Sequence, residues 1–174
     1  MELILAKMAE LHQLNWTEVK EEILLATTGY ARSDSKGYRK ATKQLIKELE
    51  YVTRSTTNKV TTYVLTEKGR EFLVESGAIV VAPRPTSNNE LHAQLKDMLT
   101  KIVKAPLPKL EIVFETLLDG HWHPIKDILA ASGYERTDSK GYRSIMSGLK
   151  KLELVEKEGS KLRFTDKAFA FGRP

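Results

Sequence analysis

The sequence contains no cysteine, and this absence excludes disulfide bonds, thiolate metal sites and catalytic cysteines. It also lacks any apolar stretch that approaches the roughly 20 residues required by a membrane-spanning helix. The first seven residues, MELILAK, become polar too soon to form the apolar part of a secretory signal. We therefore expect an intracellular protein with no membrane partner, located in prokaryotic cytoplasm or in a eukaryotic nucleus.

The motifs of common enzyme classes are missing as well. The sequence has no phosphate-binding glycine loop, no nucleophilic serine flanked by glycines and no zinc-protease helix signature. His121 and His123 flank Trp122, but two histidines without carboxylate or thiolate company make a poor metal site. These absences predict a protein that is not an enzyme and that uses no cofactor or metal.

Positive charge is in excess, with 28 Lys and Arg residues against 23 Asp and Glu residues and a formal net charge of +5. Hydrophobic residues make up 41% of the chain and charged residues 29%, which is typical of a folded globular protein. A moderate basic excess favours an anionic partner, although charge alone does not determine the fold.

The most informative feature is an internal repeat. Residues 29–39 are GYARSDSKGYR and residues 133–143 are GYERTDSKGYR, so nine of eleven positions are identical. The similarity continues upstream to Trp16 and Trp122, and downstream to the Leu-Glu pairs that begin at Leu49 and Leu152. The first copy has two more residues before the shared glycine and one more before the Leu-Glu pair. The sequence therefore predicts a duplicated unit of roughly 60–75 residues.

Each copy predicts the same order of elements, because apolar residues recur at helical spacing before and within the shared motif and Thr, Val and Tyr gather after it. In the first copy we expect helices over residues 2–14, 17–28, 35–50 and 68–74 and strands over 51–55 and 60–65. In the second copy we expect helices over residues 110–118 and 125–132, a third helix from Asp138, and a hairpin turn at 158–160. The expected helix N-caps are Thr17, Asp34 and Asp138. The expected core residues include Trp16, Trp122, Tyr38 and Tyr142, with Tyr30 and Tyr134 packed beside the turn.

Between the copies, residues 83–89 have the composition of a linker, and residues 90–104 carry apolar side chains on one helical face. We therefore expect domains at 1–78 and 109–174, joined by a segment at 79–108 that contains an amphipathic helix. This helix could pack onto one domain or join two chains, so the protein would be a monomer or a homodimer.

Two segments carry a resemblance to known proteins. Residues 65–70, LTEKGR, are similar to the segment that follows the wing in winged helix-turn-helix domains of the MarR and PadR regulator families, and residues 35–52 resemble their recognition helix. The resemblance covers both units. It implies an α+β, predominantly helical fold of two tandem winged-helix domains, each with three helices and a β-hairpin wing. It also implies binding of double-stranded DNA by a transcription regulator or chromatin-associated protein.

In such domains the second helix of the motif enters the major groove while the wing contacts the minor groove or the backbone. Here that helix is the third of each unit, and its basic residues recur at steps of three and four. The serine at its start suits a phosphate oxygen, and the glycine near its start suggests close approach by a DNA backbone or another helix. The predicted nucleic-acid-binding residues are Ser35, Lys36, Gly37, Arg39, Lys40, Lys43, Lys47, Arg54 and Lys59 in the first unit, and Ser139, Lys140, Gly141, Arg143, Lys150, Lys151, Lys157 and Lys161 in the second.

Other interpretations remain open at this point. Arg32 and Arg136 could hold phosphate, but we expect them to pair with Asp34 and Asp138. Tandem winged helices also resemble subunits of endosomal-sorting and bacterial chromosome-segregation complexes, so a protein-interaction scaffold is the alternative function. RNA or single-stranded DNA is a third possible ligand, against which the lack of exposed aromatic residues on the third helices counts. The denser basic stripe and longer hairpin of the first copy predict that it provides more of the affinity.

Overall fold

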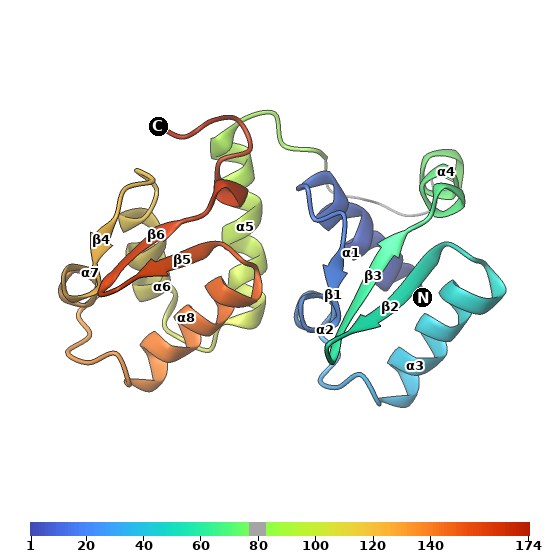
Figure 1. Ribbon diagram of the computed structural model, residues 1–174, viewed down its shortest axis with the longest axis horizontal. Helices are drawn as coiled ribbons and strands as arrows, with labels where there is room; N and C mark the ends of the chain where they lie inside the picture. Colours follow the sequence, from blue (N-terminus) through green and yellow to red (C-terminus); the bar gives the residue numbers. More distant parts are fainter. Residues whose placement is uncertain (77–82) are drawn as a thin grey trace. The chain divides into compact units, whose positions relative to one another are not determined.

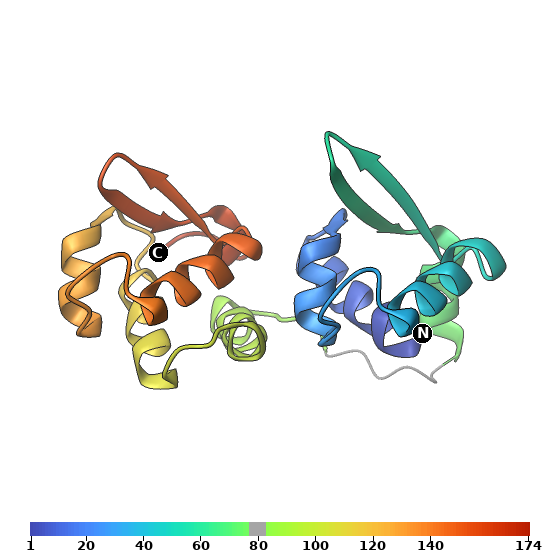
Figure 2. The ribbon, with the colours of Figure 1, turned by 90° about the horizontal axis from the view of Figure 1, so that it is seen from below.

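The computed structural model describes residues 1–76 and 83–174. The chain divides into two compact units, Met1–Arg84 and Pro85–Pro174 (Figures 1 and 2). The domain boundary expected after residue 78 falls outside the described residues. The helix expected at 90–104 runs from Asn88 to Ile102 and belongs to the second unit.

The first unit is an α+β fold of four helices around a small antiparallel sheet. Its elements are α1 (Glu2–Gln13), β1 (Val19–Lys20), α2 (Glu21–Thr28), α3 (Lys36–Lys43), a π-helical turn η1 (Gln44–Glu48), β2 (Val52–Thr57), β3 (Val60–Leu65) and α4 (Glu67–Ser76). The strand order is β1-β3-β2. The two residues that join β2 to β3, Asn58 and Lys59, both have positive φ, as a tight two-residue hairpin turn requires.

The core of the first unit forms where the apolar faces of its helices meet the sheet. Helix α1 buries Ile4, Leu5, Met8 and Leu11 at helical spacing, and such a stripe is what packs an amphipathic helix onto a core. Tyr38 from α3 is buried in the same core and is 1% exposed. The ring of Tyr30 lies 5.3 Å from it in an edge-to-face arrangement, so both tyrosines pack as the sequence predicts.

The second unit repeats this order and adds one helix in front. Its elements are α5 (Asn88–Ile102), α6 (Leu107–Thr116), β4 (His123–Pro124), α7 (Ile125–Ser132), α8 (Lys140–Lys151), β5 (Val155–Glu158), β6 (Lys161–Phe164) and a 3-10 turn η2 (Asp166–Ala168). The strand order is β4-β6-β5. The additional helix α5 packs against α6, α8 and η2 (Figure 1).

An equivalent hydrogen bond fastens the third helix to the hairpin in both units. Thr66 donates a 2.8 Å hydrogen bond from Oγ1 to the carbonyl of Glu50, and Thr165 donates the equivalent 2.8 Å bond to Glu153. Both glutamates have positive φ, 60° and 55°, a conformation that non-glycine residues adopt rarely. The duplication therefore extends from the sequence to the way in which the end of the third helix is fastened to the end of the hairpin.

The positions of the helix starts differ from the predictions. Thr17 does not cap α2, because the chain after it enters β1, where Val19 pairs with Tyr63, and the helix begins only at Glu21. The N-caps of α3 and α8 are Ser35 and Ser139 rather than the aspartates that precede them.

The two aspartates have another role. Asp34 pairs with Arg32 and Asp138 pairs with Arg136, each across the turn before the helix. The predicted Arg–Asp pairs are thus confirmed, while the predicted aspartate caps are wrong.

The two tryptophans do not occupy equivalent positions. In the sheets, Val19 pairs with Tyr63 and the equivalent residue His123 pairs with Leu162. Trp122 immediately precedes His123, whereas Trp16 lies three residues before Val19. Trp16 is 2% exposed, and its prediction as a core residue is confirmed. Trp122 is only partly buried and lies 4.4 Å beneath the guanidinium of Arg163, so the same prediction for Trp122 is wrong.

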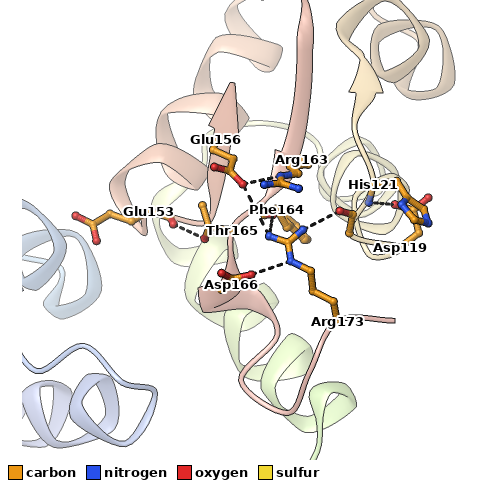
Figure 3. Close-up of polar contacts among 10 residues, drawn as sticks. Asp119, His121, Glu153, Glu156, Arg163, Phe164, Thr165, Asp166 and Arg173 are labelled. Atoms are coloured by element: carbon orange, nitrogen blue, oxygen red, sulfur yellow. Dashed lines mark hydrogen bonds and ion pairs between the residues drawn. The ribbon is translucent and has the colours of Figure 1, made fainter. Parts of the chain in front are cut away.

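The end of the chain is fastened to the second unit by Arg173 (Figure 3). Its guanidinium donates hydrogen bonds to the carbonyls of Gly120 and Phe164, at 2.8 and 3.1 Å, and to Asp166 Oδ1 at 2.7 Å.

Among the described residues, no helix combines the length and the apolar character that crossing a membrane would need.

Candidate nucleic-acid interface

Helix α3 presents a basic face because its apolar residues are used in the core. Tyr38, Ala41 and Leu45 are buried, at 1%, 5% and 1% exposure. The residues between them turn outward, and those outward positions carry cations. The exposed basic side chains of this stretch are Lys36, Arg39, Lys40, Lys43 and Lys47. The predicted basic stripe is therefore continuous on the surface of the first unit.

These cations line an open hollow of about 650 Å³ between α3 and strand β2. The lining consists of Lys36, Arg39, Lys40, Thr42, Lys43, Ile46, Lys47 and Arg54. We call this hollow the basic groove. It has six cations and no acidic side chain, and none of the six forms an ion pair with another residue in the described ranges 1–76 and 83–174. A surface lined by one sign of charge concentrates counterions of the opposite sign.

A local distortion of the helix contributes to the groove. The backbone N–H of Leu49 donates to the carbonyl of Gln44 at 3.0 Å, five residues earlier, so η1 is wider than a regular α-helical turn. The equivalent stretch of the second unit is regular helix and has one residue fewer. The additional residue of the first copy is thus accommodated in η1, which contributes Ile46 and Lys47 to the groove lining. Turns of this kind are frequent at functional sites.

The hairpin forms the second wall of the groove. In β2 only Val52 is buried, and the rest of the strand, residues 53–57, is exposed. Arg54 projects from this strand into the groove, and Lys59 lies exposed at the hairpin tip. The other exposed residues of β2 are threonines and a serine, whose hydroxyls can donate hydrogen bonds to phosphate oxygens.

Beside the basic groove lies a smaller hollow of about 220 Å³, where acidic residues do occur. Arg39 and Arg54 border both hollows, and Glu21 and Asp34 border only the smaller one. Glu21 accepts a 2.7 Å hydrogen bond from the hydroxyl of Tyr63. Burial, together with Glu21, raises the pKa of Tyr63 to about 12.

The residues at the start of the third helices are not exposed as a phosphate site would be. The hydroxyl oxygens of Ser35 and Ser139 are buried and have no hydrogen-bond partner among the described residues. A phosphate could reach them only if neighbouring side chains moved.

The glycines that follow are explained by packing within each unit. A Cβ on Gly141 would lie 2.3 Å from the hydroxyl of Tyr134, and one on Gly37 would lie 3.4 Å from the ring of Tyr30. The close approach predicted for these glycines is therefore made by the tyrosine of the preceding turn. The presence of glycine at these two positions therefore does not require the close approach of a DNA backbone.

The second unit has a sparser basic surface. Lys140, Arg143, Lys150 and Lys151 are exposed on α8, and Lys157 and Lys161 are exposed on its hairpin. Serines at 144 and 147 follow the shared motif where the first unit has Lys40 and Lys43.

One further cation of this hairpin is neutralised. Arg163 donates a 2.6 Å hydrogen bond to Glu156 (Figure 3) and covers the ring of Trp122. It is therefore held within its own unit.

The two histidines have a carboxylate partner that the sequence interpretation overlooked. Asp119 Oδ1 lies 2.8 Å from Nε2 of His123 and accepts a 2.9 Å hydrogen bond from the backbone N–H of His121. Burial would raise the pKa of Asp119, but these hydrogen bonds together lower it. Among the described residues, no three His, Cys, Asp or Glu side chains are grouped as a metal site would need.

Comparisons with known proteins identify no relative of this chain. No protein-family model matches the chain, and no match was found among curated proteins or solved structures.

Proposed function

We propose that the chain binds double-stranded DNA and that its two units are tandem winged helix-turn-helix domains. The observation that carries the proposal is the basic groove, where six cations that pair with no acidic residue of the described ranges gather between helix α3 and an exposed hairpin. The order of elements, with the hairpin directly after the basic helix, supports the same interpretation.

The proposed binding mode assigns each element of the first unit a role. Helix α3 enters the major groove, where an arginine such as Arg39 can make a bidentate contact with guanine and the lysines contact phosphates. The hairpin contacts the backbone or the minor groove through Arg54 and Lys59. Helix α8 and its hairpin make a second, weaker set of contacts. One chain then supplies two recognition helices, as a dimer usually does, which suits a transcription regulator or a chromatin-associated protein.

The test is a binding titration of the full chain with a labelled duplex of mixed sequence at several salt concentrations. If the five groove cations other than Arg39 contact phosphates, they contribute about −4.5 to the slope of log K against log salt, since each contact contributes about −0.9. Lys43→Glu should weaken binding at least ten-fold at low salt. The matched control is Lys68→Glu on α4, a lysine that already pairs with Glu50 at 3.4 Å outside the groove, and it should have little effect.

A second comparison tests the difference between the units. Arg39→Glu should weaken binding more than Arg143→Glu, because Arg39 has five further cations in its groove whereas serines follow Arg143. Absence of binding to any duplex at low salt would reject the proposal and favour a protein-interaction scaffold. Tighter binding to single strands or to RNA than to duplex DNA would also reject it.

A further inference from the structure

In the second unit the chain that leaves α5 is fastened to the flank of α8. Val103 directly follows α5, and its backbone is extended. A Cβ on Gly148 would lie only 2.5 Å from Cγ2 of Val103, so the valine packs closely against α8 at this glycine. The next backbone N–H, of Lys104, donates a 2.7 Å hydrogen bond to the hydroxyl of Ser144. Ser144 and Gly148 are one helical turn apart, so two neighbouring residues of the connection are held at two successive positions of α8. Figure 2 shows the end of α5 next to α8.

The position of Ser144 in the repeat gives this contact a functional meaning. Residues 36–39 and 140–143 are both KGYR, and the next residue is Lys40 in the first unit and Ser144 in the second. Lys40 belongs to the basic groove of the first unit. At the equivalent position α8 has Ser144, whose hydroxyl accepts a hydrogen bond from the backbone N–H of Lys104. The side chain of Lys104 starts beside the helix position that lacks a cation.

The side chain of Lys104 is available for an external ligand. It is exposed and has no ion pair with any residue in the part of the chain that the structure describes. Lys101, one turn earlier on α5, is instead paired with Asp97. Lys104 is thus the basic residue of this connection whose charge is not already compensated.

We infer that Lys104 is a nucleic-acid contact of the second unit and takes the place of the lysine that α8 lacks at position 144. This inference rests on the proposed DNA binding. The basic surface of the second unit then combines two segments, α8 with Lys140 and Arg143, and the connection before α6 with Lys104. Ser144 acts as the positioning residue, because its hydroxyl fixes the backbone from which the lysine projects.

The experiment compares Lys104→Ala with Lys101→Ala in the full chain by salt-dependent titration with the labelled duplex. Lys104→Ala keeps the backbone N–H that bonds to Ser144, so the fold should be retained. Loss of one phosphate contact should reduce the salt slope by about 0.9 and weaken binding about five-fold at 0.15 M salt. Lys101→Ala should change neither quantity.

A rescue variant separates a charge effect from a structural one. In the background of Lys104→Ala, Ser144→Lys returns a lysine to the helix position that Lys40 has in the first unit, and it should restore the slope. If Lys104→Ala behaves like Lys101→Ala while Lys43→Glu weakens binding, the role of Lys104 is refuted and the proposed function stands. If Lys43→Glu also has no effect, the proposed function fails and this inference fails with it.

Discussion

The same substitution in the two copies of the motif should destabilise the second unit but not the first. Gly→Ala within a helix gains up to about 1 kcal/mol from helix propensity. At Gly37 the new methyl group would lie 3.4 Å from the Tyr30 ring, an ordinary contact, so Gly37→Ala should be neutral or stabilising. At Gly141 it would lie 2.3 Å from the Tyr134 hydroxyl. Overpacking of this kind costs about 1–3 kcal/mol, so Gly141→Ala should lower the free energy of unfolding of the second unit by up to about 2 kcal/mol after the propensity gain.

Because the chain has two units, the measurement must report on each separately. Hydrogen exchange of amides in α3 and α8, followed by mass spectrometry, gives a free energy of opening for each unit. Tyr134→Phe removes the atom nearest to the new methyl group and should recover part of the loss in the double variant. Equal stability of Gly141→Ala and the wild-type chain would refute the reasoning, as would an equal loss from Gly37→Ala.

Two further predictions concern pH and the π-helical turn. Burial lowers the pKa of His92 below its ordinary 6.5. The unfolded chain therefore binds this proton more readily, and the second unit should lose stability as pH falls from about 6.5 through the lowered pKa. His92→Gln should flatten this dependence in thermal unfolding between about pH 7 and pH 5, and an unchanged pH profile would contradict the assignment to His92. Deletion of Gln44 should convert η1 into regular helix, as in α8, with retention of the fold. It should weaken DNA binding about five-fold if the Lys47 contact is lost, and unaltered affinity with a regular helix would show that the wider turn is not needed.

Much of the fold could be predicted because the signals were local and occurred twice. Helical spacing of apolar residues located α1 within one residue, and the Thr- and Val-rich segments located β3 at Val60–Leu65. The shared glycines end their helices with positive φ, 74° at Gly29 and 64° at Gly133. These features depend on neighbours in the sequence, which is why periodicity and turn chemistry were sufficient to find them.

The errors arose where a distant segment decides the local structure. The prediction that Thr17 caps α2 was wrong because Val19 pairs with Tyr63, and this pairing holds the chain before α2 in an extended conformation. Trp122 was matched to Trp16 by residue type, but the register of its strand with β6 sets it two positions closer to the sheet. Strand pairing of this kind depends on residues far along the chain, so a single sequence does not reveal it.

The candidate site was predictable in part for the same reason. The exposure of the basic face of α3 followed from its helical period, because Tyr38, Ala41 and Leu45 had to point inward. The contribution of Ile46 and Lys47 to the groove did not follow from that period, because it depends on η1. The one-residue difference between the copies was the signal that could have found it. The position of Lys104 left no such signal, since it depends on where α5 packs.

The differences between the two units are concentrated around the third helix. Some contacts are repeated, among them the hydrogen bond from a threonine to the glutamate of positive φ. The basic helix, by contrast, has an additional residue in the first unit and is flanked by α5 in the second. The hairpin strands have six residues each in the first unit and four each in the second. Substitutions in a packed core usually cost more stability than substitutions on the surface, so similar cores and differing surfaces are expected of any duplicated fold. The comparison of Arg39→Glu with Arg143→Glu therefore decides whether the differences around the third helix also divide the affinity for DNA between the two units.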